Sequence, residues 1–231
     1  MTELPVDPKG TRRLRRYAAE FVVIFLGVSL SFLAENVREA RADRAAERAS
    51  LVRLVRDMES DLADFPGNLE RAHEGIAAIG WIQTAQDGAL PAKDSLEHYL
   101  EGILVCSAMA ANSSEYESLK ASGSLRLIRD VEFRQALTEN YERYQALSQQ
   151  HVTDCEAQLD PLEPIADQIR IRSDRSVEIV GDVEAIMTNG RFFLALSGVR
   201  GRRGAIAGNN RSRIDALEKL RARALELLGE F

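Results

Sequence analysis

The chain has 231 residues, of which 45% are hydrophobic, 29% charged and 6% aromatic, and its formal net charge is −6. The acidic balance argues against a nucleic-acid-binding protein, and the hydrophobic fraction is too high for a disordered chain. Two cysteines and three separated histidines exclude a disulfide-rich scaffold and favour no metal site. Few runs of β-branched residues are present, so the composition predicts an all-α fold.

Charge is distributed unevenly along the chain. Residues 1–16 contain five basic and two acidic side chains, whereas residues 17–34 carry Glu20 as their only charge. Eighteen helical residues rise about 27 Å, close to the ~30 Å of a hydrocarbon core. The pattern predicts a basic N-terminal segment followed by a transmembrane helix that acts as a signal-anchor. A cleaved signal peptide and a buried helix of a soluble domain are the alternatives.

Small or polar side chains share one face of this segment. Glu20, Gly27, Ser31 and Ala34 fall within about 60° of one another at about 100° per residue. Gly27 and Ser31 have the spacing at which membrane helices pack closely. We therefore expect this face to contact an integral membrane protein or a second copy of the chain, and the other faces to contact membrane lipid. For Glu20, an ion pair with Arg16 is preferred to a role in proton transfer.

The basic residues near the segment also predict its orientation. Five lie in the eight residues before Tyr17, and two lie in the eight residues after Ala34. This imbalance predicts a cytoplasmic N-terminus and an exported C-terminal domain. In an exported domain, Cys106 and Cys155 could form a disulfide that closes a loop of 49 residues. Two unpaired buried cysteines are the alternative, and the sequence does not choose between them.

The remaining residues are predicted to form helices. Residues 35–49 contain no Gly or Pro, and their acidic residues recur every four positions, which predicts a charged helical stalk. Its charged face is interpreted as solvated, with a docking strip for a charged partner or lipid headgroups as the alternative. Residues 50–231 are predicted to form an antiparallel helical bundle. Its expected helices cover residues 50–65, 68–86, 91–107, a short stretch from 114, 131–159, 182–187 and 191–228.

Prolines, glycines and capping residues define the expected ends of these helices. Pro66 and Gly67 are expected to end the helix that begins in the stalk. Asp130 and Asp182 are predicted N-caps. Residues 165–172 are expected to resume the helix that Pro161 and Pro164 interrupt, and residues 177–180 are expected to be extended.

A glycine-rich basic stretch, residues 198–213, lies inside the last predicted helix. Its arginines include Arg200, Arg202 and Arg203. A phosphate-binding loop would need a strand before it and a helix after it at fixed spacing, and neither is predicted. We interpret the stretch as a flexible or kinked basic segment that could contact anionic lipid or an acidic partner. No catalytic, cofactor-binding or metal-binding pattern is found elsewhere, and we expect no enzymatic activity.

The run from Ser114 to Ile128, Ser-Glu-Tyr-Glu-Ser-Leu-Lys-Ala-Ser-Gly-Ser-Leu-Arg-Leu-Ile, resembles the central motif of an uncharacterised family of bacterial single-pass membrane proteins. Two further matches are Glu35-Asn36-Val37-Arg38-Glu39 and Leu51-Val52-Arg53-Leu54. The resemblance spans much of residues 17–145 and implies a membrane helix followed by a helical domain. It implies no activity and no site residues.

Together these patterns predict a non-enzymatic, single-pass protein of the bacterial inner membrane with a periplasmic domain. Its expected role is that of a scaffold or accessory subunit of a larger membrane complex, which could be respiratory, photosynthetic or transport-related. The alternative is a membrane-anchored sensor or regulator that binds a small ligand between its helices. An apolar pocket with convergent polar groups would favour that alternative.

Overall fold

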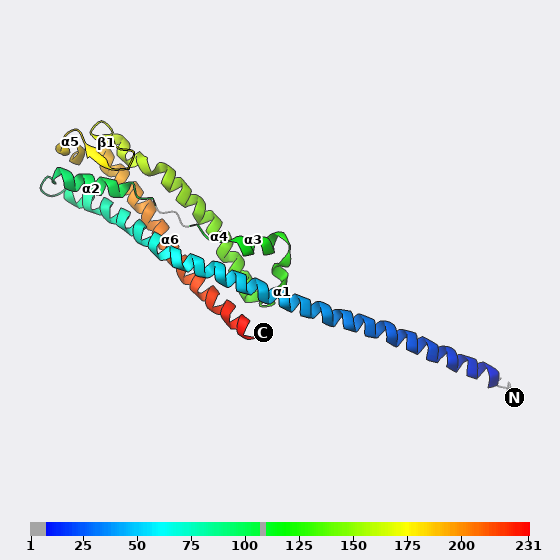
Figure 1. Ribbon diagram of the computed structural model, residues 1–231. Helices are drawn as coiled ribbons and strands as arrows, with labels where there is room; N and C mark the ends of the chain where they lie inside the picture. The colour runs from blue at the N-terminus through cyan, green and yellow to red at the C-terminus, as the bar shows by residue number, and fades with distance from the viewer. Residues whose placement is uncertain (1–7, 107–109) are drawn as a thin grey trace, which may run out of the picture. The chain divides into compact units, whose positions relative to one another are not determined.

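The computed structural model describes the backbone of residues 8–106 and 110–231, and the side chains of the same residues from Glu20 onwards. Within this part of the chain there are six α-helices, two 3₁₀ helices and one two-stranded sheet (Figure 1). The all-α fold predicted from the sequence is therefore confirmed. The basic side chains of residues 9–16, which carry the orientation argument, lie outside the described side chains.

The chain divides into two compact units, residues 1–49 and residues 50–231. The first unit contains a helix whose apolar residues 21–33 are all at least half exposed. This helix is long and apolar enough to cross a membrane, and none of its most apolar stretch is buried. The coarse prediction of an apolar N-terminal helix that could be a span or an anchor is confirmed.

Helix α1 (Pro8–Ala85) continues through Pro66, so the expectation that Pro66 and Gly67 end the helix is wrong. Proline removes one backbone hydrogen bond, but it does not prevent continuation where packing on both sides holds the helix in place. Phe65 and Leu69 provide this packing, because both are buried in the core. Tertiary contacts therefore override the local signal.

Shorter elements follow α1. They are α2 (Lys93–Ile103), α3 (Ser114–Ala121), η1 (Ser124–Leu127), α4 (Val131–Glu156), η2 (Ala157–Ile165) and α5 (Val183–Met187). The predicted caps are confirmed, since Asp130 accepts from Phe133 N at 2.8 Å and Asp182 accepts from Glu184 N at 3.0 Å. These bonds satisfy backbone donors that a helix leaves free at its first turn.

The segment after η2 is a hairpin rather than a helix. Strand β1 (Ile169–Ile171) pairs antiparallel with β2 (Val177–Ile179), with Ile169 opposite Ile179. The extended conformation expected at 177–180 is confirmed, and the helix expected at 165–172 is wrong. The backbone N–H groups of Val177 and Ile179 donate to carboxylates of α2. The α2 carboxylates thus satisfy the edge of the small sheet.

Helix α6 (Gly190–Gly229) runs unbroken through the glycine-rich basic stretch. A flexible or kinked segment was expected there, and that expectation is wrong. Glycine lowers helix stability, but the buried side chains Val199, Ile206 and Ala207 anchor the stretch against the bundle. A Cβ atom added at any of the glycines 198, 201, 204 and 208 would meet no neighbouring atom within 4 Å, so these glycines lie on the outer face of the helix.

Two apolar clusters form the core of residues 50–231. One joins α1 around Met58 to α3, the first half of α4 and the second half of α6. The other joins α1 around Ile82 to α2, η2, the hairpin, α5 and the first half of α6. Helices α4 and α6 run antiparallel, as contacts at both ends of the pair show: Arg223 meets Asp130 and Arg203 meets Asp154 (Figure 1).

Candidate functional site

Polar side chains line the contact between α4 and α6 along its whole length. At one end Arg223 Nε donates to Asp130 at 3.1 Å. In the middle, Arg213 Nη1 donates to the Asn140 carbonyl at 3.4 Å. Towards the other end, His151 and Asn210 share a buried hydrogen bond of 3.1 Å. This contact is therefore not a simple apolar helix interface.

A groove of about 640 Å³ opens between these two helices. We call it the α4–α6 groove. Its apolar wall comprises Phe133, Ala136, Leu147, Ala216 and Leu220, and its polar residues comprise Glu132, Glu139, Asn140, Arg143, Asn209, Ser212, Arg213, Lys219 and Arg223. An apolar wall with a few polar groups is typical of a small-molecule site.

Arg213 is the most unusual residue in the groove. Its side chain is only 5% exposed, and its guanidinium carbon lies 3.9 Å from the centre of the Tyr144 ring. Neither Nε nor Nη2 has a hydrogen-bond partner among the described residues. Burial lowers the pKa of Arg213 to about 10, so the group stays charged at neutral pH. A buried cation with two unused donors is costly, which marks the position as a candidate site.

Asp61 of α1 is a buried acid whose charge interacts with that of Arg213. Its Oδ1 accepts from Asn112 N at 2.8 Å, whereas its Oδ2 has no partner among the described residues. Burial raises the pKa of Asp61 to about 6, although the hydrogen bond from Asn112 and the charge of Arg213 oppose the rise. Asp61 and Arg213 make no direct ion pair within the described residues. Asp61 therefore does not satisfy the free donors of Arg213.

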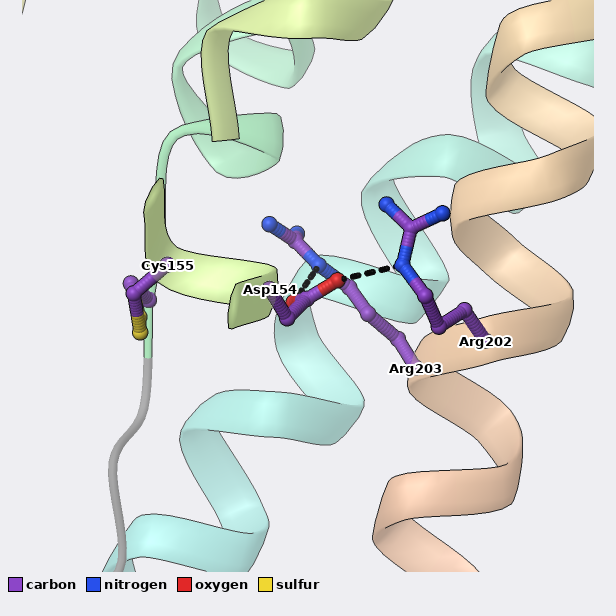
Figure 2. The surroundings of a disulfide bond; sticks show 5 residues. Asp154, Cys155, Arg202 and Arg203 are labelled. Atoms are coloured by element: carbon purple, nitrogen blue, oxygen red, sulfur yellow. Dashed lines mark hydrogen bonds and ion pairs between the residues drawn. A yellow bond between two sulfur atoms is a disulfide. The ribbon is translucent and has the colours of Figure 1, made fainter. Parts of the chain in front are cut away.

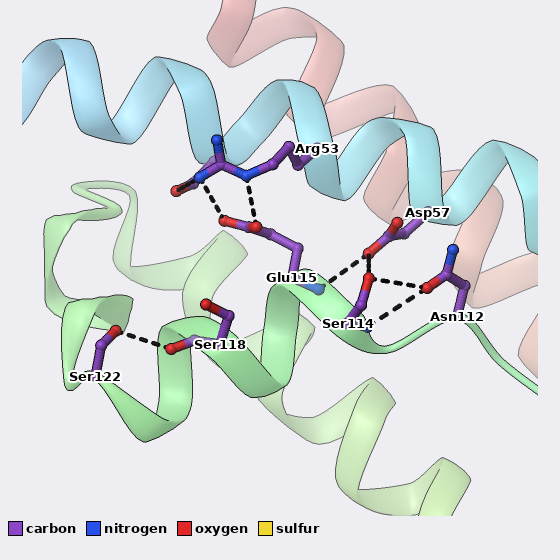
Figure 3. Close-up of polar contacts among 8 residues, drawn as sticks. Arg53, Asp57, Asn112, Ser114, Glu115, Ser118 and Ser122 are labelled. Atoms are coloured by element: carbon purple, nitrogen blue, oxygen red, sulfur yellow. Dashed lines mark hydrogen bonds and ion pairs between the residues drawn. The ribbon is translucent and has the colours of Figure 1, made fainter.

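A second polar group next to Asp61 anchors α3 to α1 (Figure 3). Asp57 accepts from Ser114 Oγ at 3.2 Å and from Glu115 N at 3.1 Å. Asp57 thus caps α3 from another helix. Glu115 accepts from Nε and Nη2 of Arg53 at 2.6 and 2.9 Å. The Ser114 hydroxyl, the Glu115 backbone N–H and the Nε and Nη2 groups of Arg53 all meet acceptors within the chain, so the role of this group is structural.

The three arginines expected to meet lipid or an acidic partner make contacts within the chain. Asp154 lies between the guanidinium groups of Arg202 and Arg203 and accepts from the Nε of each at 3.0 Å (Figure 2). Arg203 is 6% exposed, and Arg200 donates to Gln83 of α1 at 2.9 Å. The acid that Arg203 meets is therefore Asp154 of the same protein.

Cys106 and Cys155 form a disulfide, with their Cα atoms 5.4 Å apart. The bond joins the end of α2 to the end of α4, and Cys155 directly follows Asp154 (Figure 2). No free cysteine is present in the part of the chain that the structure describes. The two alternatives that the sequence left open are thus resolved in favour of the paired form.

The four residues of the expected membrane face are all exposed. Ser31 Oγ donates to the Gly27 carbonyl at 2.9 Å, which satisfies the hydroxyl inside its own helix. A Cβ atom added at Gly27 would meet no neighbour within 4 Å. Contact of Glu20, Gly27, Ser31 and Ala34 with a second helix stays a prediction. In the same described region, no three His, Cys, Asp or Glu side chains are grouped closely enough to hold a metal ion.

Arg213 and Asn140 were not predicted as site residues, although the sequence contains a signal for Arg213. Buried positions of α6 alternate at spacings of three and four residues, and the apolar members of this series include Ile206, Leu217 and Leu220. Asn210 and Arg213 occupy the same series. Polar residues at such core positions weaken packing and point to a specific role. The composition of the basic stretch does not show this pattern, which appears only in the spacing of its buried positions.

Comparison of the chain with protein-family models, with curated proteins and with solved structures finds no match.

Proposed function

We propose that the protein is a single-pass membrane protein without enzymatic activity, and that its helical bundle acts as a scaffold or accessory subunit of a larger membrane complex. One observation carries the proposal: the apolar residues 21–33 are exposed along the helix, whereas residues 50–231 bury two apolar clusters of their own. A soluble protein rarely exposes so long a run of large apolar side chains. Membrane lipid and a partner helix are the environments that would cover it.

The proposed location is the bacterial inner membrane, with the N-terminus in the cytoplasm and the bundle in the periplasm. The disulfide between Cys106 and Cys155 supports this orientation, because disulfides persist in oxidising compartments and are rare in the cytosol. Reporter fusions after Phe231 test the orientation. We expect activity from alkaline phosphatase, which needs an oxidising compartment. Activity only from a fused cytoplasmic reporter would contradict the proposed location.

Purification of the tagged full chain from native membranes in mild detergent tests the accessory role. We expect a stoichiometric partner helix or a second copy of the chain to co-purify. Gly27→Phe should release this partner, because a bulky side chain prevents close approach of two helix backbones. Val28→Leu is the matched control on the bulkier face and should retain the partner. A wild-type chain that purifies as a lone monomer would contradict the accessory role.

The α4–α6 groove favours a second function, that of a membrane-anchored sensor or regulator of a small ligand. Its volume of about 640 Å³ lies inside the range of roughly 300–1,000 Å³ that small-molecule sites occupy. Asn140 and Arg213 both line it, are at least nine-tenths buried and carry polar atoms without partners. Polar side chains with unused bonding capacity beside an apolar wall support the ligand-binding alternative.

A further inference from the structure

We propose that the α4–α6 groove binds a single-chain amphiphilic carboxylate, whose carboxylate is received by Arg213 and whose aliphatic chain lies along the apolar wall. The proposal rests on the second function above and names its ligand class. It does not depend on the accessory role, because a bundle with an occupied groove can also bind another protein.

The free edge of Arg213 determines the headgroup. Nε and Nη2 form the side of a guanidinium group that binds both oxygens of a carboxylate in parallel. Arg53 uses these two nitrogens to bind Glu115, at 2.6 and 2.9 Å. In Arg213 the same two nitrogens have no partner among the described residues. The chain thus contains one such arginine–carboxylate pair, Arg53 with Glu115. It also contains Arg213 beside the groove, in which the same two nitrogens have no partner among the described residues.

Some of the basic side chains that line the groove are already paired with acidic side chains of the protein. Arg143 is paired with Glu139, and Arg223 is paired with Asp130 and Glu226. Arg213 and Lys219 have no ion pair among the described residues. Four basic and two acidic side chains line the groove, and this excess of positive charge favours an anionic ligand over a neutral or cationic one.

The free edge of Arg213 places the headgroup at one part of the groove. Glu132 lies eight residues before Asn140 on α4, which is about 12 Å along a helix. Lys219 lies near the Glu132 end, beside the pair of Arg223 with Asp130, so the charges at that end offset one another and do not direct the ligand. Phe133, Ala136, Ala216 and Leu220 line the groove between these ends. Phe133 and Leu220 are already buried, so an aliphatic chain lying over this wall would cover mainly the apolar surface that Ala136 and Ala216 still expose.

The free edge of Arg213 is closed to water in this structure, because both nitrogens are buried. Binding therefore requires rotation of Arg213 or of side chains beside it, a local change common at binding interfaces. The rival explanation for the free edge is a buried water molecule shared with Oδ2 of Asp61. The experiment below separates the two explanations, since only the first gives saturable binding of a carboxylate.

The test is a titration of the full chain in phosphatidylcholine nanodiscs with decanoate labelled with ¹³C at the carboxyl carbon, after subtraction of empty nanodiscs. We expect one saturable site and a shift of the carboxyl resonance. Decanol and decyltrimethylammonium should bind at least tenfold more weakly, because they lack the negative charge. Equal binding of decanol and decanoate would overturn the proposal.

Two variants with matched controls locate the site. Ala216→Phe should abolish saturable binding by filling the groove, while Ala205→Phe on an exposed face of α6 should leave it unchanged. Arg213→Lys should weaken binding at least tenfold, because an ammonium group cannot bind both oxygens in parallel, while Arg211→Gln should have no effect. A folded Ala216→Phe protein that binds like the wild type would overturn the proposal.

A last arm concerns the source of the anion. Nanodiscs containing phosphatidylglycerol should leave decanoate binding unchanged. Loss of decanoate binding in them would overturn the choice of a free carboxylate, since a membrane lipid would then occupy the groove. Recovery of a co-purifying protein with the Ala216→Phe variant is measured separately, so failure of the ligand proposal is distinguishable from failure of the accessory role.

Discussion

Helix α6 contains two buried arginines ten residues apart, and their surroundings differ. Arg203 pairs with Asp154, which also accepts from Arg202, and the disulfide of Cys155 lies next to this acid. Arg213 stacks on Tyr144 and meets no carboxylate directly. Each arginine has two nitrogens without a partner among the described residues, Nη1 and Nη2 in Arg203 and Nε and Nη2 in Arg213. The two differ because Arg203 pairs with an acid, whereas Arg213 makes no ion pair among the described residues and keeps the carboxylate-binding edge of its guanidinium group free.

A glycine of α1, Gly75, makes room for the side chain of Arg203. A Cβ atom added at Gly75 of α1 would lie 3.3 Å from Nη1 of Arg203 and 3.3 Å from the Gly102 carbonyl. Glycine at this position thus leaves room for a guanidinium group between α1 and the end of α2. Carbonyl groups at the end of a helix carry partial negative charge, which favours a cation there. Nη1 and Nη2 of Arg203 nevertheless make no hydrogen bond among the described residues, so its one direct partner there is Asp154.

Removal of Asp154 is expected to have the largest effect on stability. Asp154→Ala leaves Arg203 buried without its counter-charge, and loss of one partner of a buried pair typically destabilises by about 3–5 kcal/mol. Denaturant unfolding of the full chain in detergent measures the change. Asp215→Ala removes the exposed, 3.9 Å pair with Arg211 and should change stability by less than about 1 kcal/mol. Equal effects of the two substitutions would contradict the structural role of Asp154.

Loss of the disulfide should have the next largest effect on stability. The disulfide lies next to Asp154, the partner of Arg203, and not near Arg213. A bond across 49 residues should contribute about 2–4 kcal/mol. We expect the Cys106→Ser/Cys155→Ser double variant to be destabilised by this amount. Reductant should bring the wild type to the level of the double variant and leave the double variant unchanged. A wild type insensitive to reductant under unfolding conditions would contradict the prediction.

Near Arg213, we expect the contribution of Asp61 to the stability of the protein to depend on pH. Burial raises the pKa of Asp61 to about 6 from an ordinary value of 3.8. Between these values the unfolded chain loses the proton before the folded chain does, so the contribution of Asp61 to stability is greatest below about pH 4 and is lost as the pH rises to about 6. The loss amounts to about 2–3 kcal/mol. Comparison of unfolding at pH 4, 5, 6 and 7 measures it.

The matched variants for this prediction are Asp61→Asn and Asp87→Asn. The first removes the titrating group and should be more stable than the wild type at pH 7, with a flatter dependence on pH between 4 and 6. The second replaces an exposed acid and should follow the wild-type profile. A wild-type and an Asp61→Asn profile that run parallel would show that Asp61 titrates normally in the folded protein.

Much of the bundle was predictable from local signals. Asp130 and Asp182 cap helices where their short side chains and the following residues predict them. Pro66 was misread because proline is a local signal, whereas the burial of Phe65 and Leu69 that continues the helix comes from distant parts of the chain. The hairpin at β1 was missed because its three-residue strands are too short to show an alternating pattern.

The site was less predictable than the fold. The positions of Asn210 and Arg213 in the apolar series of α6 are visible in the sequence, but the lack of a partner for Arg213 is not. That property depends on Asp61 and Tyr144, which lie 152 and 69 positions away along the chain. Only the packed structure shows that Arg203 meets an acid and that Arg213 stacks on an aromatic ring instead.

The smallest expected effect is also the most direct test of the comparison between the two arginines. Arg213→Met should change the free energy of unfolding at pH 7 by less than about 1 kcal/mol. It removes the stacking on Tyr144, but it also removes two buried donors without partners, and these contributions have opposite signs. Arg203→Met likewise removes two buried nitrogens without partners, but it also removes a charge-assisted hydrogen bond to Asp154 and should destabilise by about 2–3 kcal/mol. Because the charge of Arg213 lowers the pKa of Asp61, Arg213→Met should also extend the fall in stability to higher pH, whereas Arg203→Met should leave the pH range of the fall unchanged. If both substitutions were equally destabilising and neither changed this pH range, Arg213 would be a structural residue like Arg203.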